Sequence, residues 1–279
     1  MDFETFKLRQ DDGVLTVTLE NPPINLMSGK MVAELFQLSG SLAQNSQVRV
    51  VVIDSSNPDF FIAHFDLRDL AGAANDTSNP TPNPNINSLQ SLGLSWQTLP
   101  QVKIAKIDGR CRGGGFEFVL ALDMCFASER SLFCFPEGSS GFLAAGGGAT
   151  RTVLTAGPPR ALEVLLSARD FSAAEAERYG LINRSLHAAE LDGYVAGLAS
   201  RVARRSPAVI SMHRKVVECA RAPFSRTLVE GFAAENEGLR AGLAGTEMLR
   251  IVELLLAAGQ SRENELDLPA TLASMAARG

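Results

Sequence analysis

The chain has 279 residues, 46% of them hydrophobic and 20% charged, and a formal net charge of −5, which is ordinary globular composition for one large or two modest domains. Without a basic cluster no nucleic-acid partner is expected. The acidic, polar N-terminus and the absence of an apolar run of about 18 residues predict a cytoplasmic protein with no membrane partner.

The first elements along the chain alternate between strand and helix patterns. Residues 13–20 alternate apolar and polar side chains, which is typical of a half-buried strand, and the β-branched run at 48–56 predicts a strand covered on both faces. Between them, residues 28–45 carry apolar side chains at helical spacing behind Ser28, an N-cap candidate. These segments predict a β–α–β unit.

The next part of the chain continues this alternation after a loop. Residues 73–88 hold three prolines and five asparagines without periodicity, so we expect an exposed, mobile loop there. Further strands are expected at 102–109, 124–129 and 132–135, and residues 113–123 predict a glycine-rich entry into a buried helix. The core is therefore predicted to be α/β.

The last part of the sequence changes character. From residue 146 onward the amphipathic pattern is almost wholly helical, and the tail after Gln260 has too weak a pattern to be assigned. The sequence thus predicts a sheet-bearing part followed by a mainly helical C-terminal part.

Several common site motifs are absent from the sequence. Gly113–Gly115 are consecutive and do not have the G-x-G-x-x-G spacing of a dinucleotide site, and the only Gly-Lys pair, at residues 29–30, precedes a methionine rather than Ser or Thr. The GSSG stretch at 138–141 lacks the spacing of a nucleophile elbow. Four scattered cysteines without a CxxC pair, and three scattered histidines, indicate reduced, partly buried thiols and no metal site.

Two glutamates, Glu117 and Glu137, remain as candidates because each follows a glycine-rich or proline-containing break. A glycine run allows a substrate close to the main chain and leaves N–H groups unpaired at a helix N-terminus, which suits a developing negative charge. Glu117 lies about one turn into that helix, between Phe116 and Phe118. The alternative is that Glu117 is a solvated helix-terminal charge and Glu137 a surface loop residue.

Three blocks together resemble the enoyl-CoA hydratase/isomerase, or crotonase, superfamily. Residues 105–154 are similar to its signature of a strand, a DG turn, a GGG-x-E helix, a CD strand and a PE loop followed by a glycine-rich turn. FFIAHFDLRDL at 60–70 is similar to its F-x-A-G-A-D-L block, and 171–186 is similar to its S-A-x-E-A block. The matches extend from about residue 5 to residue 220.

The resemblance implies a fold, a substrate class and an assembly. The fold is α/β, a spiral of β-β-α repeats in a core over residues 1–200, with a helical C-terminal oligomerisation region at 201–279 that builds homotrimers or dimers of trimers. The substrate is an acyl-CoA thioester, so coenzyme A belongs to the substrate and no separate cofactor is expected.

The resemblance also implies roles for individual residues. The main-chain N–H groups of Phe65 and Gly114 match those that hold the thioester oxygen, and Glu117 and Glu137 match the pair that holds a water. Substrate contacts are expected from the block around Phe65 and from the glycine run, namely Ala63, His64, Phe65, Asp66, Leu67, Arg68 and Gly114.

The chain departs from the family pattern at several positions. His64 stands where glycine is usual and Phe65 where a small residue is usual, so His64 is either a packing or solvent-facing residue or a substrate contact. The C-terminal segment lacks the Phe and Lys/Arg-Pro ending that often helps to hold the CoA phosphates. Arg68, Arg110 and Arg112 are alternative cations for the nucleotide, or simply solvated arginines.

Three functions remain open at this point. Retention of both glutamates favours a 2-enoyl-CoA hydratase that uses them as an acid/base pair. An isomerase, C–C hydrolase or decarboxylase that needs one carboxylate is the alternative within the same fold. A non-catalytic scaffold that has lost acyl-CoA affinity is the third.

Overall fold

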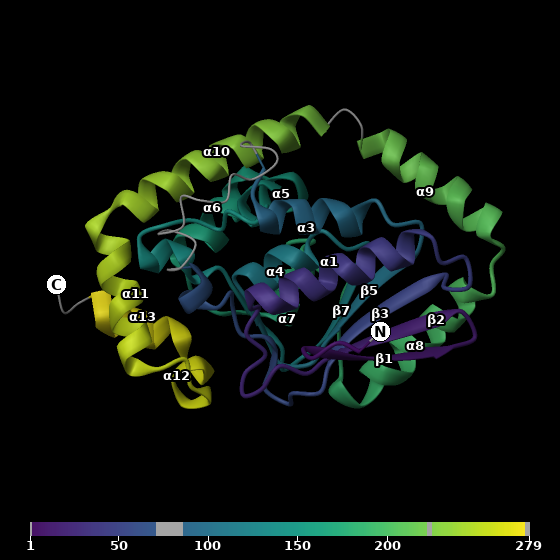
Figure 1. The fold of residues 1–279 in the computed structure, drawn as a ribbon, viewed down its shortest axis with the longest axis horizontal. Coiled ribbons are helices and arrows are strands. Elements are labelled where there is room, and N and C mark those ends of the chain that lie inside the picture. Colours follow the sequence, from purple (N-terminus) through teal and green to yellow (C-terminus); the bar gives the residue numbers. More distant parts are fainter. Residues whose placement is uncertain (1, 71–85, 222–224, 277–279) are drawn as a thin grey trace.

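The computed structural model describes residues 2–70, 86–221 and 225–276, which form two β-sheets and a helical C-terminal region (Figure 1). Of the loop expected at 73–88, residues 73–85 lie outside the described residues. The strands are β1 (Phe6–Asp11), β2 (Val14–Leu19), β3 (Val50–Ser55), β4 (Phe60–Ile62), β5 (Val102–Ile107), β6 (Arg110–Arg112), β7 (Met124–Ser128), β8 (Leu132–Cys134), β9 (Phe171–Ser172) and β10 (Arg184–Leu186).

The helices surround the sheets and then extend beyond them. They are α1 (Gly29–Ala43), α3 (Ser88–Gln97), α4 (Gly114–Val119), the 3-10 helix η1 (Pro136–Ser140), α5 (Gly148–Ala156), α6 (Pro158–Ser167), α7 (Ala173–Arg178), α8 (Ala188–Ala203), α9 (Pro207–Arg221), α10 (Ser225–Ala244), α11 (Thr246–Ala258), α12 (Arg262–Leu266) and α13 (Leu268–Ala276).

From β3 to β8, consecutive strands of the chain enter the two sheets in turn. The larger sheet has the order β1-β2-β3-β5-β7-β10 and the smaller one β4-β6-β8-β9. Only the outer pairs β1–β2 and β8–β9 are antiparallel; the other pairs in the described residues are parallel. Each repeat thus adds one strand to each sheet before a helix returns the chain, which confirms the predicted spiral of β-β-α repeats.

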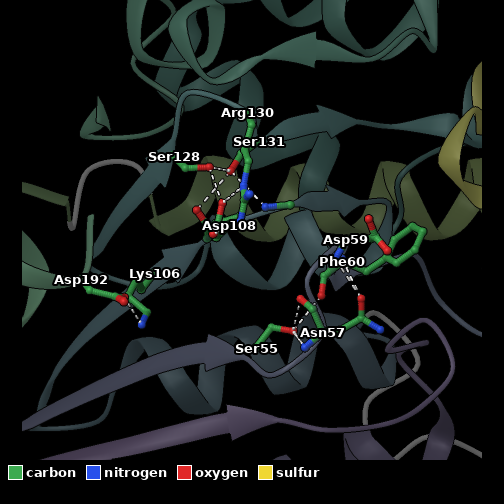
Figure 2. Close-up of polar contacts among 12 residues, drawn as sticks. Ser55, Asn57, Asp59, Phe60, Lys106, Asp108, Ser128, Arg130, Ser131 and Asp192 are labelled. Atoms are coloured by element: carbon green, nitrogen blue, oxygen red, sulfur yellow. Dashed lines mark hydrogen bonds and ion pairs between the residues drawn. The ribbon is translucent and has the colours of Figure 1, made fainter. Parts of the chain in front are cut away.

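The corner between β3 and β4 is closed by polar side chains. Ser55 Oγ donates to Phe60 O over 2.7 Å, and Asn57 Oδ1 accepts from the main-chain N–H groups of Asp59 and Phe60 (Figure 2). The next corner stacks on it, because Arg110 N donates to Asp59 O over 2.8 Å. At that corner Gly109 has φ +127°, and a methyl group there would lie 2.7 Å from the Asp59 carbonyl. Only glycine allows the two corners to approach so closely.

A second polar cluster joins the β5–β6 corner to the β7–β8 corner. Asp108 accepts a hydrogen bond of 2.6 Å from Ser128 Oγ and forms an ion pair with Arg130, and Ser131 Oγ donates to Ile107 O (Figure 2). Buried polar groups are stable only when they are paired in this way. The clusters therefore keep successive repeats in register, which in turn aligns the segments that follow each strand.

The main core lies between the sheets and the helices α1, α3 and α4. Its largest side chains are aromatic: Trp96 meets Phe118 edge-on at 5.2 Å between centroids, and Phe116 packs 4.8 Å from Phe133. Trp96 also donates its indole N–H to Leu35 O over 3.2 Å. Such pairs contribute about 0.5–1.5 kcal/mol each beyond the area they bury. They hold α4 rigidly, and α4 carries the glycine run.

The helices α9 and α10 extend around the outside of the core (Figure 1). In Figure 1, α10 extends along the top of the molecule past α5, and α11, α12 and α13 gather at one end. Leu67 joins an apolar cluster with residues of α11 and α13, including Ile251 and Leu272. None of the helices in the described ranges is long and apolar enough to cross a bilayer.

The predicted elements are confirmed with small differences at their ends. Helix α1 begins behind Ser28, whose side chain accepts from Met31 N. The helix expected at 113–123 ends at Val119, and the unassigned tail forms α12 and α13. The division at residues 200 and 201 stays a prediction; α8 extends across that position.

Several short strands were not predicted. β4, β6, β9 and β10 have two or three residues each, too short to show a period. In β1 only Phe6 is buried, because this edge strand has one neighbour and faces solvent with polar and charged side chains. The expectation of an almost wholly helical region after residue 146 is confirmed, with β9 and β10 as the exceptions among the described residues.

Candidate active site

A cavity of about 600 Å³ lies between the helices α3, α4 and η1 and the C-terminal helices. Its lining residues come from segments far apart in the chain, and most of its wall is apolar. Its lining consists of His64, Phe65, Leu67, Leu70, Asn87, Ser88, Leu89, Gly114, Glu117, Pro136, Glu137, Ser140, Phe142, Leu143, Ala145, Gly146, Leu239, Leu243, Leu255, Leu268 and Leu272.

Phe65 and Gly114 lie next to each other in this wall. A methyl group added to Gly114 would lie 3.3 Å from Phe65 Cβ. The flanking residues His64 and Asp66 bond to Met27, since His64 O accepts from Met27 N and Asp66 N donates to Met27 O. In this strand-like pairing the N–H of Phe65 points away from Met27.

Both of these main-chain N–H groups are available to a ligand. Gly114 is the first residue of α4, so its N–H has no partner within the helix. In the ranges that the structure describes, no oxygen accepts a hydrogen bond from Phe65 N or Gly114 N. Two free N–H donors therefore lie side by side at a cavity wall.

Glu117 projects from the first turn of α4 into the cavity, and it is 4% exposed. Its Oε2 accepts from Gly148 N, the first residue of α5, over 2.8 Å. Close packing fixes this carboxyl, because a methyl group on Gly146 would lie 2.9 Å from Glu117 Oε2. The alternative of a solvated helix-terminal charge is wrong, because the aromatic core around α4 excludes water.

Glu137 approaches the same cavity from η1 and is 8% exposed, so the alternative of a surface loop residue is also wrong. Its Oε1 lies close to the glycine run, since a methyl group added to Gly113 would be 2.8 Å from this oxygen. Within the described residues its Oε2 is buried and has no hydrogen-bond partner. A buried carboxylate oxygen without a partner is costly, and a bound ligand or water would relieve that cost.

Both carboxyl groups have a raised proton affinity, mainly because they are buried. Burial raises the pKa of Glu117 well above its ordinary value, and the charges of Glu137 and Glu235 raise it further, against the effect of hydrogen bonds from Gly148 and Gly146. Burial also raises the pKa of Glu137, to about 7, although its own N–H and the charge of His64 act in the opposite direction. These shifts favour a protonated Glu117 beside a Glu137 that can still ionise near neutral pH.

The structure places some of the other predicted substrate contacts at the cavity and others away from it. His64 and Leu67 line the cavity with Phe65 and Gly114, whereas Ala63, Asp66 and Arg68 do not. Ala63 is buried in a small apolar cluster beside Phe60. Asp66 accepts from Arg68 over 2.7 Å, and Arg68 itself is largely exposed.

Two of the three candidate arginines are engaged inside the protein. Arg112 is fully buried and forms an ion pair of 2.5 Å with Asp170, so both expectations for it, a solvated arginine or a free cation for the nucleotide, are wrong. Arg110 Nε donates to Leu266 O over 3.0 Å. Of the three, Arg68 alone remains at the surface.

Sequence reasoning missed part of the wall. The leucines Leu239, Leu243, Leu268 and Leu272 reach the cavity from α10 and α13. Their spacing of four residues was a signal for an apolar helix face, but that spacing does not show what the face covers.

Two buried acids of the C-terminal helices were also missed. Glu235 accepts from Gly147 N over 2.8 Å and from Thr150 N over 2.7 Å, so it caps α5. Glu265 bonds to His64.

The thiols are placed as expected. Cys111, Cys125 and Cys134 are buried, whereas Cys219 is exposed, and all four are free. In the described part of the chain no group of three or more His, Cys, Asp or Glu side chains is arranged to hold a metal ion.

Comparison with known proteins agrees with this geometry. The model of the enoyl-CoA hydratase/isomerase family matches residues 9–246. The carnitinyl-CoA dehydratase of Proteus mirabilis (strain HI4320) is 27% identical over 237 residues, which are 85% of this chain and 87% of that protein. The carnitinyl-CoA dehydratase of Escherichia coli (strain K12) is 27% identical over 214 residues, 76% of this chain and 80% of that one.

Solved structures show the same fold. The crystal structure of a "putative enoyl-CoA hydratase" from Streptomyces avermitilis superposes with a TM-score of 0.89 at 33% identity over 100% of both chains. The enoyl-CoA hydratase from Bacillus halodurans has a TM-score of 0.79 at 22% identity, over 90% of this chain and 100% of that one. With the family model matching most of its length, the chain belongs to the enoyl-CoA hydratase/isomerase family.

Proposed function

We propose that the protein is a 2-enoyl-CoA hydratase, which adds water across the double bond conjugated to a thioester. The observation that carries the proposal is the arrangement of Glu117 and Glu137 around one cavity whose wall also presents the free N–H groups of Phe65 and Gly114. Hydration needs a base for water, an acid for Cα and donors for the enolate oxygen. These groups supply all three.

The proposed chemistry needs one of the two carboxyl groups ionised and the other protonated. The ionised member takes a proton from water as the water attacks Cβ, and the protonated member gives its proton to Cα. The N–H groups of Phe65 and Gly114 hold the thioester oxygen while negative charge develops on it, and such a donor contributes about 2.7–4 kcal/mol. Loss of the Phe65 side chain would leave its N–H in place.

The lining of the cavity favours an alkyl acyl group. Leucines from α10, α11 and α13 form much of the wall, and Glu117 and Glu137 are its only carboxylates among the described residues. A carnitinyl group carries a quaternary ammonium, which proteins hold with aromatic faces or negative charge. With both carboxyl groups assigned to the reaction, we infer an uncharged, apolar acyl chain.

The decisive assay compares thioesters with the double bond at position 2 or 3. Loss of the conjugated absorbance of a 2-enoyl-CoA, with formation of the 3-hydroxyacyl product, supports a hydratase. Conversion of a 3-enoyl-CoA without water addition supports an isomerase instead. Saturable binding of acetoacetyl-CoA in a calorimetric titration contradicts the scaffold hypothesis.

Activity is expected to fall in acid. Since burial raises the pKa of Glu137 to about 7, lowering the pH through about 7 protonates both carboxyl groups and removes the base. The rate should therefore decrease about tenfold for each unit below that value and level off above it. A kcat/KM profile against pH for a 2-enoyl-CoA measures this; a flat profile between pH 5 and about 8 contradicts it.

We also propose that the chain forms the homotrimer or dimer of trimers that the family resemblance implies. Large apolar side chains stand exposed on α6 and α9, with Leu166 72% and Val216 70% exposed. Exposed apolar groups gathered on one face of a helix indicate a contact surface. Val216→Asp should give smaller particles in sedimentation velocity, whereas Ser211→Asp on the same helix should not. An unchanged mass for Val216→Asp contradicts this surface.

A further inference from the structure

His64 and Glu265 form a buried pair in the cavity wall, although they lie 201 residues apart in the chain. His64 Nε2 is 3.0 Å from Glu265 Oε1, and the two side chains are almost fully buried. On the other side of the ring, Nδ1 lies 2.7 Å from Phe65 O. The ring thus connects a residue of the free N–H pair to the C-terminal helix α12.

The partners of the ring determine how many protons the pair holds. Phe65 O can only accept a hydrogen bond, so Nδ1 must carry a proton. The contact of 3.0 Å between Nε2 and a carboxyl oxygen then needs a second proton between them. Burial alone would lower the pKa of His64, but the carboxylate of Glu265 and the hydrogen bonds outweigh burial and raise that pKa. This raised pKa favours the ring over the carboxyl as the site of the second proton, and the ring is then an imidazolium.

The His64 side chain and Glu137 both lie close to Gly113 in the glycine run. A methyl group on Gly113 would lie 2.8 Å from Glu137 Oε1 and 3.5 Å from His64 Cβ, so the two side chains border the same small space. Other charges near the ring come from Arg112 of β6, which Asp170 neutralises, and from Glu265. Glu137 in turn faces Glu117 on α4.

Helix α12 is fastened to the segment that carries His64. Gln260, just before the helix, accepts from Leu67 N over 3.1 Å and donates to Asp66 Oδ1 over 3.0 Å. Arg262 pairs with Asp59 at 2.6 Å. These contacts fix the position of Glu265 against His64 before any substrate binds.

We propose that His64 and Glu265 are positioning residues that hold an imidazolium beside Glu137, which keeps Glu137 ionised as hydration begins and fixes the peptide of Phe65. The inference rests on the proposed function, because it assigns a task to Glu137 in that reaction. It also makes α12 a part of the active site. His64 also lines the cavity, so the substrate contact expected of it stays a prediction beside this electrostatic role.

Glu265→Gln tests the electrostatic role with little change in shape. A glutamine amide can donate to the bare Nε2 of a neutral ring, so the hydrogen bond survives while the extra proton is lost. The variant removes the charge of the Glu265 carboxylate together with that of the ring, but the ring is the one that lowers the pKa of Glu137. The acid limb of the kcat/KM profile should therefore move to higher pH. Glu263→Gln, an exposed carboxyl on the same helix, should leave the limb in place. If the folded Glu265→Gln variant has its acid limb at the same pH as the wild type, the proposal is overturned.

Histidine NMR tests the proton count on the unmodified chain and needs no activity. The chain has only three histidines, so labelled ring nitrogens are few, and the signals missing in His64→Gln identify His64. At about pH 7.5 an ordinary histidine is neutral, whereas both His64 nitrogens should show imidazolium shifts. A neutral His64 ring at that pH overturns the proposal. A charged ring in a chain that hydrates no 2-enoyl thioester contradicts only the proposed function.

Discussion

Replacing Glu117 or Glu137 by glutamine is expected to lower kcat for hydration of a 2-enoyl-CoA by about 10²–10⁴-fold. Each carboxyl faces the cavity, and the reaction needs one of them ionised and the other protonated. Glutamine keeps the size of the side chain but can neither take nor give a proton at neutral pH. The initial rate of loss of the conjugated absorbance measures the effect.

The loss should not result from unfolding. Glutamine at position 117 can still accept from Gly148 N with its amide oxygen, and it removes a carboxyl buried beside two others. The unfolding midpoint of Glu117→Gln should therefore equal or exceed that of the wild type. Glu190→Gln, an exposed carboxyl on α8, serves as the control and should hydrate at full rate. Full activity in both cavity variants would falsify the acid/base assignment.

Glu235→Gln is expected to destabilise the fold by roughly 1–3 kcal/mol. All three groups that bond to this carboxylate are donors, namely Gly147 N, Thr150 N and the amide of Gln90. A glutamine offers one oxygen and one NH₂ group, so at least one buried donor would face another donor. Thermal unfolding should show a midpoint lower by several degrees, and Glu237→Gln, exposed on the same helix, should show none of this decrease.

Glu235→Gln should also affect activity, although Glu235 does not line the cavity. It caps the N-terminus of α5, and the next residue there, Gly148, donates to Glu117. A displaced α5 would move that donor and change how Glu117 is held. Activity measured below the unfolding transition should therefore fall in Glu235→Gln and not in Glu237→Gln. A variant with unchanged unfolding midpoint and rate contradicts this role.

Local sequence was sufficient where a short segment carries its own physics. Ser28 was predicted as an N-cap and is one, because capping involves residues within a single turn. The buried run that became β3 was predicted because its β-branched residues are apolar throughout. β1 was missed because an edge strand exposed to solvent has no apolar alternation to detect.

In the candidate site, too, some residues were recognisable from the local sequence and others depended on distant partners. The glycine run and Glu117 form a recognisable local pattern, and Glu137 follows a visible break at Pro136. The burial of Arg112 was not predictable, because its partner Asp170 lies 58 residues away. His64 was ambiguous for the same reason, since a histidine shows its role only through the groups it meets.

By itself, the sequence determined the alternation of strands and helices, the glycine run at the start of α4 and the two acids near it, because these depend on residues close together in the chain. Only the tertiary structure decided that α10, α11 and α13 close the cavity with leucines, that Glu235 caps α5, and that Glu265 meets His64. Those contacts join segments separated by many residues. Side-chain spacing along a helix shows that a face is apolar, but the partner of that face depends on how the whole chain packs.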